Sequence, residues 1–218
     1  MSYDYRGKVI AVTGGAGGIA GAFVPHAARR GARLAIIDLR GPAAERVAAS
    51  LPGSGHRSYA VDLTDEAQVV ALVEELDRDF GRLDVLINNA GMSSQERFDE
   101  RDVASIRREL DVNLLSPLML TRLAMPLLRA APDPRVISTV SLGGIFPLGE
   151  TPIYTASKFG LRGRCSRSGS TSRRRASPSR RCCRRPPTPR CCAGRPSRAA
   201  TRCSSRTRPS RPPPSRRP

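Results

Sequence analysis

After residue 164 the chain contains no large apolar side chain, and this limits what it can fold into. Residues 165–218 use seven residue types, namely Arg, Ser, Pro, Cys, Ala, Thr and Gly. They carry 17 Arg and no acidic residue, whereas the first 164 residues hold 20 basic and all 19 acidic residues. Without large side chains to bury, a segment cannot offset its loss of conformational entropy. We therefore predict a near-neutral folded domain over 1–164 and a disordered Arg/Ser/Pro/Cys-rich tail over 165–218.

Three interpretations of this tail are open. An arginine-rich arm would bind phosphates, and a nucleic acid is an expected partner only if the tail is genuine. A metal site is the second, but its candidate ligands form no CxxC pair and have no histidine nearby: Cys182, Cys183, Cys191 and Cys192. The third, which we favour, is a shift of reading frame after about residue 163, since GC-rich codons read out of frame yield these residue types. We expect no metal.

The folded part has the features of a cytoplasmic domain. No apolar run in it approaches the roughly 18 residues of a membrane helix. Its N-terminus carries Asp4, Arg6 and Lys8, which is unlike a signal peptide. All six cysteines follow residue 164, so the domain fits a reducing compartment. We expect a cytoplasmic location and no membrane contact.

Short apolar runs alternate with helically spaced patterns along the first 164 residues. The expected strands are 8–13, 33–38, 57–61, 85–88 and 135–141. The expected helices are 18–30, 42–51, a third with Thr64 as its N-cap, about 114–131, and a fifth starting near Tyr154. Strands alternating with helices indicate βαβ units and a parallel sheet. The predicted fold class is α/β, a Rossmann-like doubly wound sheet.

A glycine-rich segment, Gly14 to Ala20, joins the first expected strand to the first helix. Small residues there let the backbone approach a pyrophosphate placed on the helix N-terminus. Asp38 ends the second strand, 24 residues after Gly14. A carboxylate at this point accepts hydrogen bonds from ribose hydroxyls and repels a 2′-phosphate. The pattern predicts NAD rather than NADP, with Arg40 nearby as the opposing signal.

Six blocks, in order over residues 7 to about 163, resemble the short-chain dehydrogenase/reductase family. Thr13 to Ala20 is similar to its TGxxxGIG loop, with Ala20 as a departure, and Asp62 matches the acid that meets the adenine. Asn88-Asn89-Ala90-Gly91 matches its NNAG block. The resemblance implies cofactor contacts from Thr13, Gly14, Gly15, Gly17, Gly18, Ile19, Asp38, Asp62, Leu63, Asn89, Ala90, Gly91, Tyr154 and Lys158.

The same resemblance implies a catalytic tetrad of Asn113, Ser141, Tyr154 and Lys158, the last two reading as YxxxK. Tyr154 and Lys158 are four apart on a helix, so their side chains share a face. An ammonium near a phenol stabilises the phenolate, which suits proton exchange with an alcohol or carbonyl. The implied activity is hydride transfer between NAD(P) and a small alcohol or ketone substrate.

The family pattern is incomplete on its C-terminal side. The family continues after YxxxK with a longer helix and two more strands, and it forms homo-oligomers when complete. We therefore expect the fifth strand to be an exposed edge of the sheet. Two alternatives to an active oxidoreductase follow: an inactive, truncated cofactor-binding half-fold, or a phosphate- or nucleic-acid-binding protein that acts through its tail.

Overall fold

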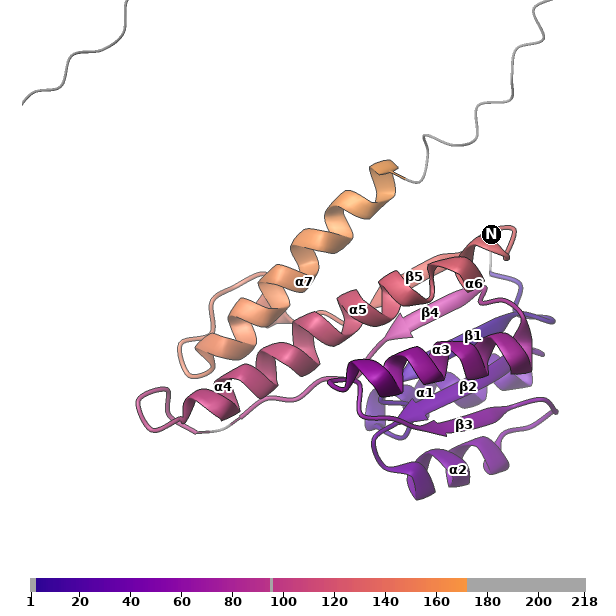
Figure 1. The fold of residues 1–218 in the computed structure, drawn as a ribbon, viewed down its shortest axis with the longest axis horizontal. Helices are drawn as coiled ribbons and strands as arrows, with labels where there is room; N and C mark the ends of the chain where they lie inside the picture. Colours follow the sequence, from indigo (N-terminus) through magenta and orange to yellow (C-terminus); the bar gives the residue numbers. More distant parts are fainter. Residues whose placement is uncertain (1–2, 95, 172–218) are drawn as a thin grey trace, which may run out of the picture. The chain divides into compact units, whose positions relative to one another are not determined.

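The computed structural model describes residues 3–94 and 96–171 (Figure 1). The strands are β1 (Val9–Thr13), β2 (Arg33–Asp38), β3 (Arg57–Ala60), β4 (Val85–Asn88) and β5 (Arg135–Ser138). The α-helices are α1 (Gly18–Arg29), α2 (Gly41–Ser50), α3 (Glu66–Phe80), α4 (Val103–Leu110), α5 (Ser116–Leu123), α6 (Met125–Arg129) and α7 (Pro152–Thr171). A π-helical turn, η1 (Asp111–Leu115), joins α4 to α5, and a 3-10 turn, η2 (Leu142–Gly144), follows β5.

The strands form a parallel sheet with the order β3-β2-β1-β4-β5. The order reverses direction at β1, so the sheet is doubly wound, as predicted. The register places Thr13 beside Ile37, and Asn88 beside Ser138. The carboxyl ends of β1, β2, β4 and β5 therefore meet at one edge, which is where ligands bind in open α/β sheets.

The core has two layers because successive residues of a strand face opposite sides of the sheet. Val9 and Ala11 of β1 face α3, α5 and α6, whereas Ile10 and Val12 face α1 and α2. β1 and β4 are buried throughout. Among the described residues, no helix has both the length and the apolar character needed to cross a bilayer.

The helix predicted over 114–131 starts earlier, at Val103, and passes through η1 into α5 and α6 (Figure 1). Asp102 caps α4, and its side chain accepts a hydrogen bond from the Ser105 amide at 2.6 Å. The residue that α4 buries is the charged Glu109, whereas its apolar residues Val103, Ile106 and Leu110 lie at helical spacing but are exposed or only partly buried. The sequence thus carries a helical repeat here that the prediction over 114–131 missed.

The N-cap predicted for α3 is also corrected. Asp65, not Thr64, caps the helix, and its carboxylate accepts from the amides of Ala67 and Gln68. Thr64 donates its hydroxyl to Asp62 at 2.7 Å and therefore belongs to the turn before the helix. Asp and Thr are both good N-cap residues, so adjacent candidates are not separated by propensity.

The last helix runs past residue 164, where the predicted tail begins. α7 continues through Thr171, so residues 165–171 are helical where we predicted disorder from Cys165 onward. Extending a helix that is already nucleated costs much less than starting one, even for Ser- and Arg-rich residues. The rest of the tail lies outside the described residues, and so do the metal-site and arginine-arm hypotheses for it.

β5 is the outer strand of the sheet, as predicted. Val136 and Ile137 are adjacent, so their side chains point to opposite faces, yet they are 39% and 49% exposed. Both faces of β5 are thus largely uncovered within the described structure, in contrast to β1 and β4.

Candidate functional site

The glycine-rich loop forms a tight strand-to-helix connection after β1. Gly14 has φ +62°, and a Cβ there would lie 3.0 Å from the Cα of Ala90. A Cβ on Gly15 would lie 2.7 Å from the Cγ2 of Ile36. Gly17 is the N-cap of α1 without a side-chain cap, and the first turn of α1 contains no acid. The amides at this helix end are therefore available to an anion.

Thr13 and Asn89 join this loop to the end of β4. The Thr13 hydroxyl accepts hydrogen bonds from the amides of Asn89 and Ala90, both at 3.0 Å. The Asn89 side chain donates to the carbonyls of Thr13 and Gly14 at 3.2 and 3.3 Å. Both side chains, predicted as cofactor contacts, thus have internal partners and hold two loops of the site together.

Asp38 lies at the end of β2 and bridges two loops. Its carboxylate accepts from the Ala16 amide at 3.0 Å and from the Arg40 amide at 3.0 Å. The Arg40 guanidinium also forms an ion pair with it at 3.3 Å. The structure thus brings Asp38 beside the glycine-rich loop, and part of its charge is compensated by Arg40.

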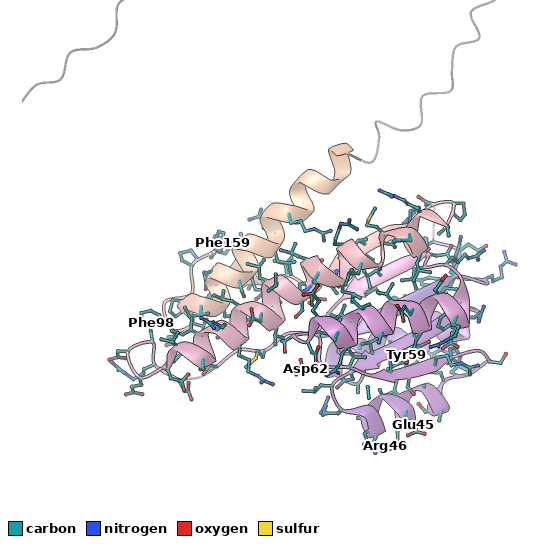
Figure 2. All side chains as sticks on the ribbon, in the orientation of Figure 1. Glu45, Arg46, Tyr59, Asp62, Phe98 and Phe159 are labelled. Atoms are coloured by element: carbon teal, nitrogen blue, oxygen red, sulfur yellow. The ribbon has the colours of Figure 1, made fainter. Side chains whose placement is uncertain are left out.

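Asp62 and Leu63 occupy the turn after β3 (Asp62 is labelled in Figure 2). Hydrogen bonds from the hydroxyl and amide of Thr64 hold the pKa of Asp62 below its usual value. Leu63 is partly buried against the core that contains α3. Asp62 is therefore an ionised acceptor at neutral pH, next to the carboxyl end of the sheet.

Asn113 lies within the π-helical turn η1 and is fully buried. Its side chain makes a pair of hydrogen bonds with Met92: the oxygen accepts from the amide at 2.9 Å, and the nitrogen donates to the carbonyl at 2.8 Å. A π-helical turn inserts one extra residue and is often found at functional sites. The turn directs Asn113 toward the segment that follows β4.

Tyr154 and Lys158 lie on α7, one helical turn apart. The Lys158 ammonium is 5.5 Å from the centroid of the Tyr154 ring and donates to the Thr139 carbonyl at 3.1 Å. Lys158 is 4% exposed, and this burial lowers its pKa. A Cβ on Gly91 would lie 3.1 Å from the Asn113 side-chain oxygen and 3.3 Å from the Lys158 ammonium. Gly91 therefore lets these two side chains come together.

Ser141 is the N-cap of η2, and its hydroxyl oxygen accepts from the Gly143 amide at 3.2 Å. A Cβ on Gly143 would lie 3.3 Å from the Tyr154 ring. Ser141 is thus connected to the Tyr154 ring through the short η2 turn. Because its oxygen is the acceptor in this bond, its O–H remains able to donate elsewhere.

Sequence reasoning missed the contribution of Thr139. The residues assigned from the sequence do not include Thr139. In the structure its carbonyl accepts from Lys158, and its hydroxyl donates to Asn89 at 3.2 Å. Backbone carbonyls carry no residue-type signal, so the first of these roles could not be found from the sequence. The two histidines, His26 and His56, contact Arg30 and Leu34 and lie outside this cluster.

The fold and the site together define a doubly wound α/β protein with a glycine-rich loop and a Tyr–Lys pair at the ligand-binding edge. The chain is 33% identical over 167 residues to D-threitol dehydrogenase from Mycolicibacterium smegmatis, covering 75% of this chain and 64% of that protein. It is 39% identical over 162 residues to L-fucose dehydrogenase from Bos taurus, covering 72% and 58%. The chain therefore spans about three fifths of the length of these relatives.

Solved structures of short-chain dehydrogenases have the same fold. A short-chain dehydrogenase/reductase from Burkholderia phymatum in complex with NAD superposes with a TM-score of 0.69 at 26% identity, covering 76% of this chain and 60% of that one. NAD+-bound xylitol dehydrogenase gives 0.69 at 28% identity, covering 74% and 64%. The family described as short chain dehydrogenase matches residues 8–170. The chain belongs to this family.

Proposed function

We propose that the chain is an oxidoreductase that binds NAD and exchanges a hydride with a small alcohol or ketone. The observation that carries this proposal is the cluster of Tyr154, Lys158, Asn113 and Gly91 beside the glycine-rich loop. The bound NAD of two structural neighbours supports the choice of cofactor. We extend to this chain the family's small-molecule substrates, its cytoplasmic location and its assembly as a homo-oligomer.

The residues present fit a dinucleotide. The N-terminus of α1 offers amides without an acidic side chain, and the space in front of Gly18 is open to at least 4 Å. We assign the pyrophosphate to this helix end, the ribose of the adenosine to Asp38, and the adenine to Asp62 and Leu63. Ile19 lies in the first turn of α1 and is 68% exposed. The nicotinamide half of the bound cofactor would cover this apolar side chain. When bound, the nicotinamide supplies or accepts the hydride.

In this proposal Tyr154 is the group that exchanges a proton with the substrate oxygen. Lys158 places a buried positive charge near the ring, where it stabilises the phenolate in a low-dielectric setting. The Ser141 hydroxyl, whose oxygen already accepts from Gly143, donates a hydrogen bond to the substrate oxygen and keeps its proton. Asn113 holds the segment after β4 and, by family resemblance, a water that relays protons to the solvent.

Asp38→Asn tests the cofactor assignment. Asn keeps the size of the side chain and one oxygen for the Ala16 amide, but it removes the charge that opposes a 2′-phosphate. We expect the ratio of NADPH to NADH affinity to rise roughly tenfold, measured by nucleotide fluorescence titration. Glu45→Gln removes the same charge from the exposed face of α2 (Figure 2) and should leave the ratio unchanged. An equal effect of Asp38→Asn on both nucleotides would contradict the assignment.

A further inference from the structure

A buried ion pair between Arg101, which precedes α4, and Glu109, which lies on α4, is found outside the proposed catalytic cluster. The Arg101 guanidinium contacts the Glu109 carboxylate at 2.5 Å, and the two side chains are 4% and 1% exposed. The second Glu109 oxygen has no hydrogen-bond partner among the described residues. Burying two charges is costly, so a buried ion pair is weak evidence of a role in stability alone.

Arg101 lies across the first turn of α4. Besides Glu109, its guanidinium donates to the Ser105 carbonyl at 3.1 Å and to the Ser105 hydroxyl at 2.9 Å. Asp102, the next residue, caps the same helix. The planar guanidinium binds Glu109 and Ser105 of α4 at the same time. Because its donors have a fixed geometry, these bonds set the position of Arg101 along α4 more strictly than a single apolar contact would.

The same helical run also holds the chain where it leaves β4. Asn113 is four residues after Glu109, and it binds both backbone groups of Met92. Residues four apart lie on one face of a helix. The run from α4 to η1 therefore contacts both ends of the β4–α4 connection. Asn113 binds Met92 near the start of this connection, and Glu109 binds Arg101 at its end.

α7, which carries Tyr154 and Lys158, packs against both α4 and η1. The side chains of Asn113 and Lys158 meet at Gly91. A shift of α4 along its own axis would therefore move Asn113 relative to Lys158. The buried pair opposes such a shift because the Glu109 carboxylate would move away from the Arg101 guanidinium.

We propose that Arg101 and Glu109 are a positioning pair, which sets the register of α4 against the segment after β4 and so holds Asn113 and Gly91 in place beside Lys158. Neither residue touches the reacting atoms. The inference rests on the proposed function for its catalytic meaning, but the register itself can be measured without any activity.

The test is a double variant, Arg101→Met with Glu109→Met, which replaces the pair by apolar side chains of similar length. Such replacements of buried pairs are often neutral or stabilising, so the denaturant midpoint should not fall. The Met92 amide donates a hydrogen bond to the Asn113 side chain. Its hydrogen exchange should nevertheless become roughly tenfold faster. The affinity for NADH is measured in parallel, and it alone reports on the proposed function.

Arg97→Met is the matched control, since Arg97 pairs with Asp99 and Glu100 at the exposed surface before α4. It should leave exchange at Met92 unchanged. If the double variant does not fold, Arg101→Lys carries the test, because it keeps the charge beside Glu109 but loses the fork to Ser105; a smaller acceleration at Met92 is expected. Unchanged Met92 protection in a folded double variant, or in Arg101→Lys, would overturn the proposal.

Discussion

Lys158 shows how one buried charge connects stability to function at the scale of a residue. Its ammonium lies in a buried position near Tyr154, with the Thr139 carbonyl as its hydrogen-bond acceptor. A neutral carbonyl compensates a charge less well than a carboxylate does, and burial accordingly lowers the pKa. The positive charge that we assign to phenolate stabilisation therefore has a folding cost.

This cost predicts how stability depends on pH. Below the lowered pKa both the folded and the unfolded chain bind the proton, and the full cost of burying the charge is present. As pH rises from the folded pKa toward 10.5, the folded state releases its proton first, so the cost disappears. In Lys158→Met this change is absent.

We therefore expect the free energy of unfolding of the wild type to rise relative to Lys158→Met between pH 7 and pH 10. The gain is about 1.4 kcal/mol for each unit by which folding lowers the pKa. Urea unfolding of both proteins at several pH values measures it. A difference between the two proteins that does not change with pH would show that Lys158 titrates as in the unfolded chain.

At the scale of the element, β5 differs from its neighbours. Its backbone pairs with β4 on one side, while its other edge has no strand beside it in the described structure. Val136 and Ile137 expose apolar surface on both faces of this strand. An open edge with apolar residues is a template for pairing with other chains.

Ile137→Lys should therefore slow aggregation of the chain. A lysine on an edge strand opposes the approach of a second strand through its charge and its length. We expect the half-time of aggregation to increase by at least about threefold, followed by light scattering at fixed protein concentration. Val103→Lys adds the same charge to an exposed apolar position on α4 and serves as the control. Equal slowing by both variants would show that net charge, rather than the β5 edge, controls aggregation.

At the scale of the whole molecule, the two halves of the site differ in completeness. The loops proposed for the adenosine half are tied together by Thr13, Asn89 and Asp38 within the sheet. On the substrate side, Leu142 and Phe146 next to Ser141 are 69% and 61% exposed. Tyr154 is itself partly exposed, so water reaches the phenol although Lys158 is buried, and this weakens electrostatic stabilisation on that side.

We predict that the purified chain binds NADH but turns over substrate slowly. Typical enzymes reach about 10 s⁻¹, and misplacing a reacting group by roughly 1 Å costs about 100-fold, so a rate below about 0.1 s⁻¹ is expected. D-threitol and xylitol are the first substrates to try, because relatives are named for them. A rate near 10 s⁻¹ that Tyr154→Phe abolishes would disprove this prediction.

The sequence by itself determined the βαβ order, because apolar runs and helical repeats depend on local spacing. The predicted strand Arg33–Asp38 matches β2, and Val85–Asn88 matches β4. It also identified the glycine-rich loop, since a tight turn follows from short-range geometry. The family resemblance pointed to the Tyr154–Lys158 pair, whose shared helix face follows from its spacing.

Tertiary structure alone decided the features that depend on contacts between distant residues. The buried pair of Glu109 and Arg101 could not be predicted from the sequence, because charged side chains normally mark an exposed helix face. The π-helical turn that presents Asn113, and the Thr139 carbonyl that accepts from Lys158, are backbone features without a residue code. Their positions follow from how the carboxyl ends of β4 and β5 meet α7, which requires the whole sheet to form.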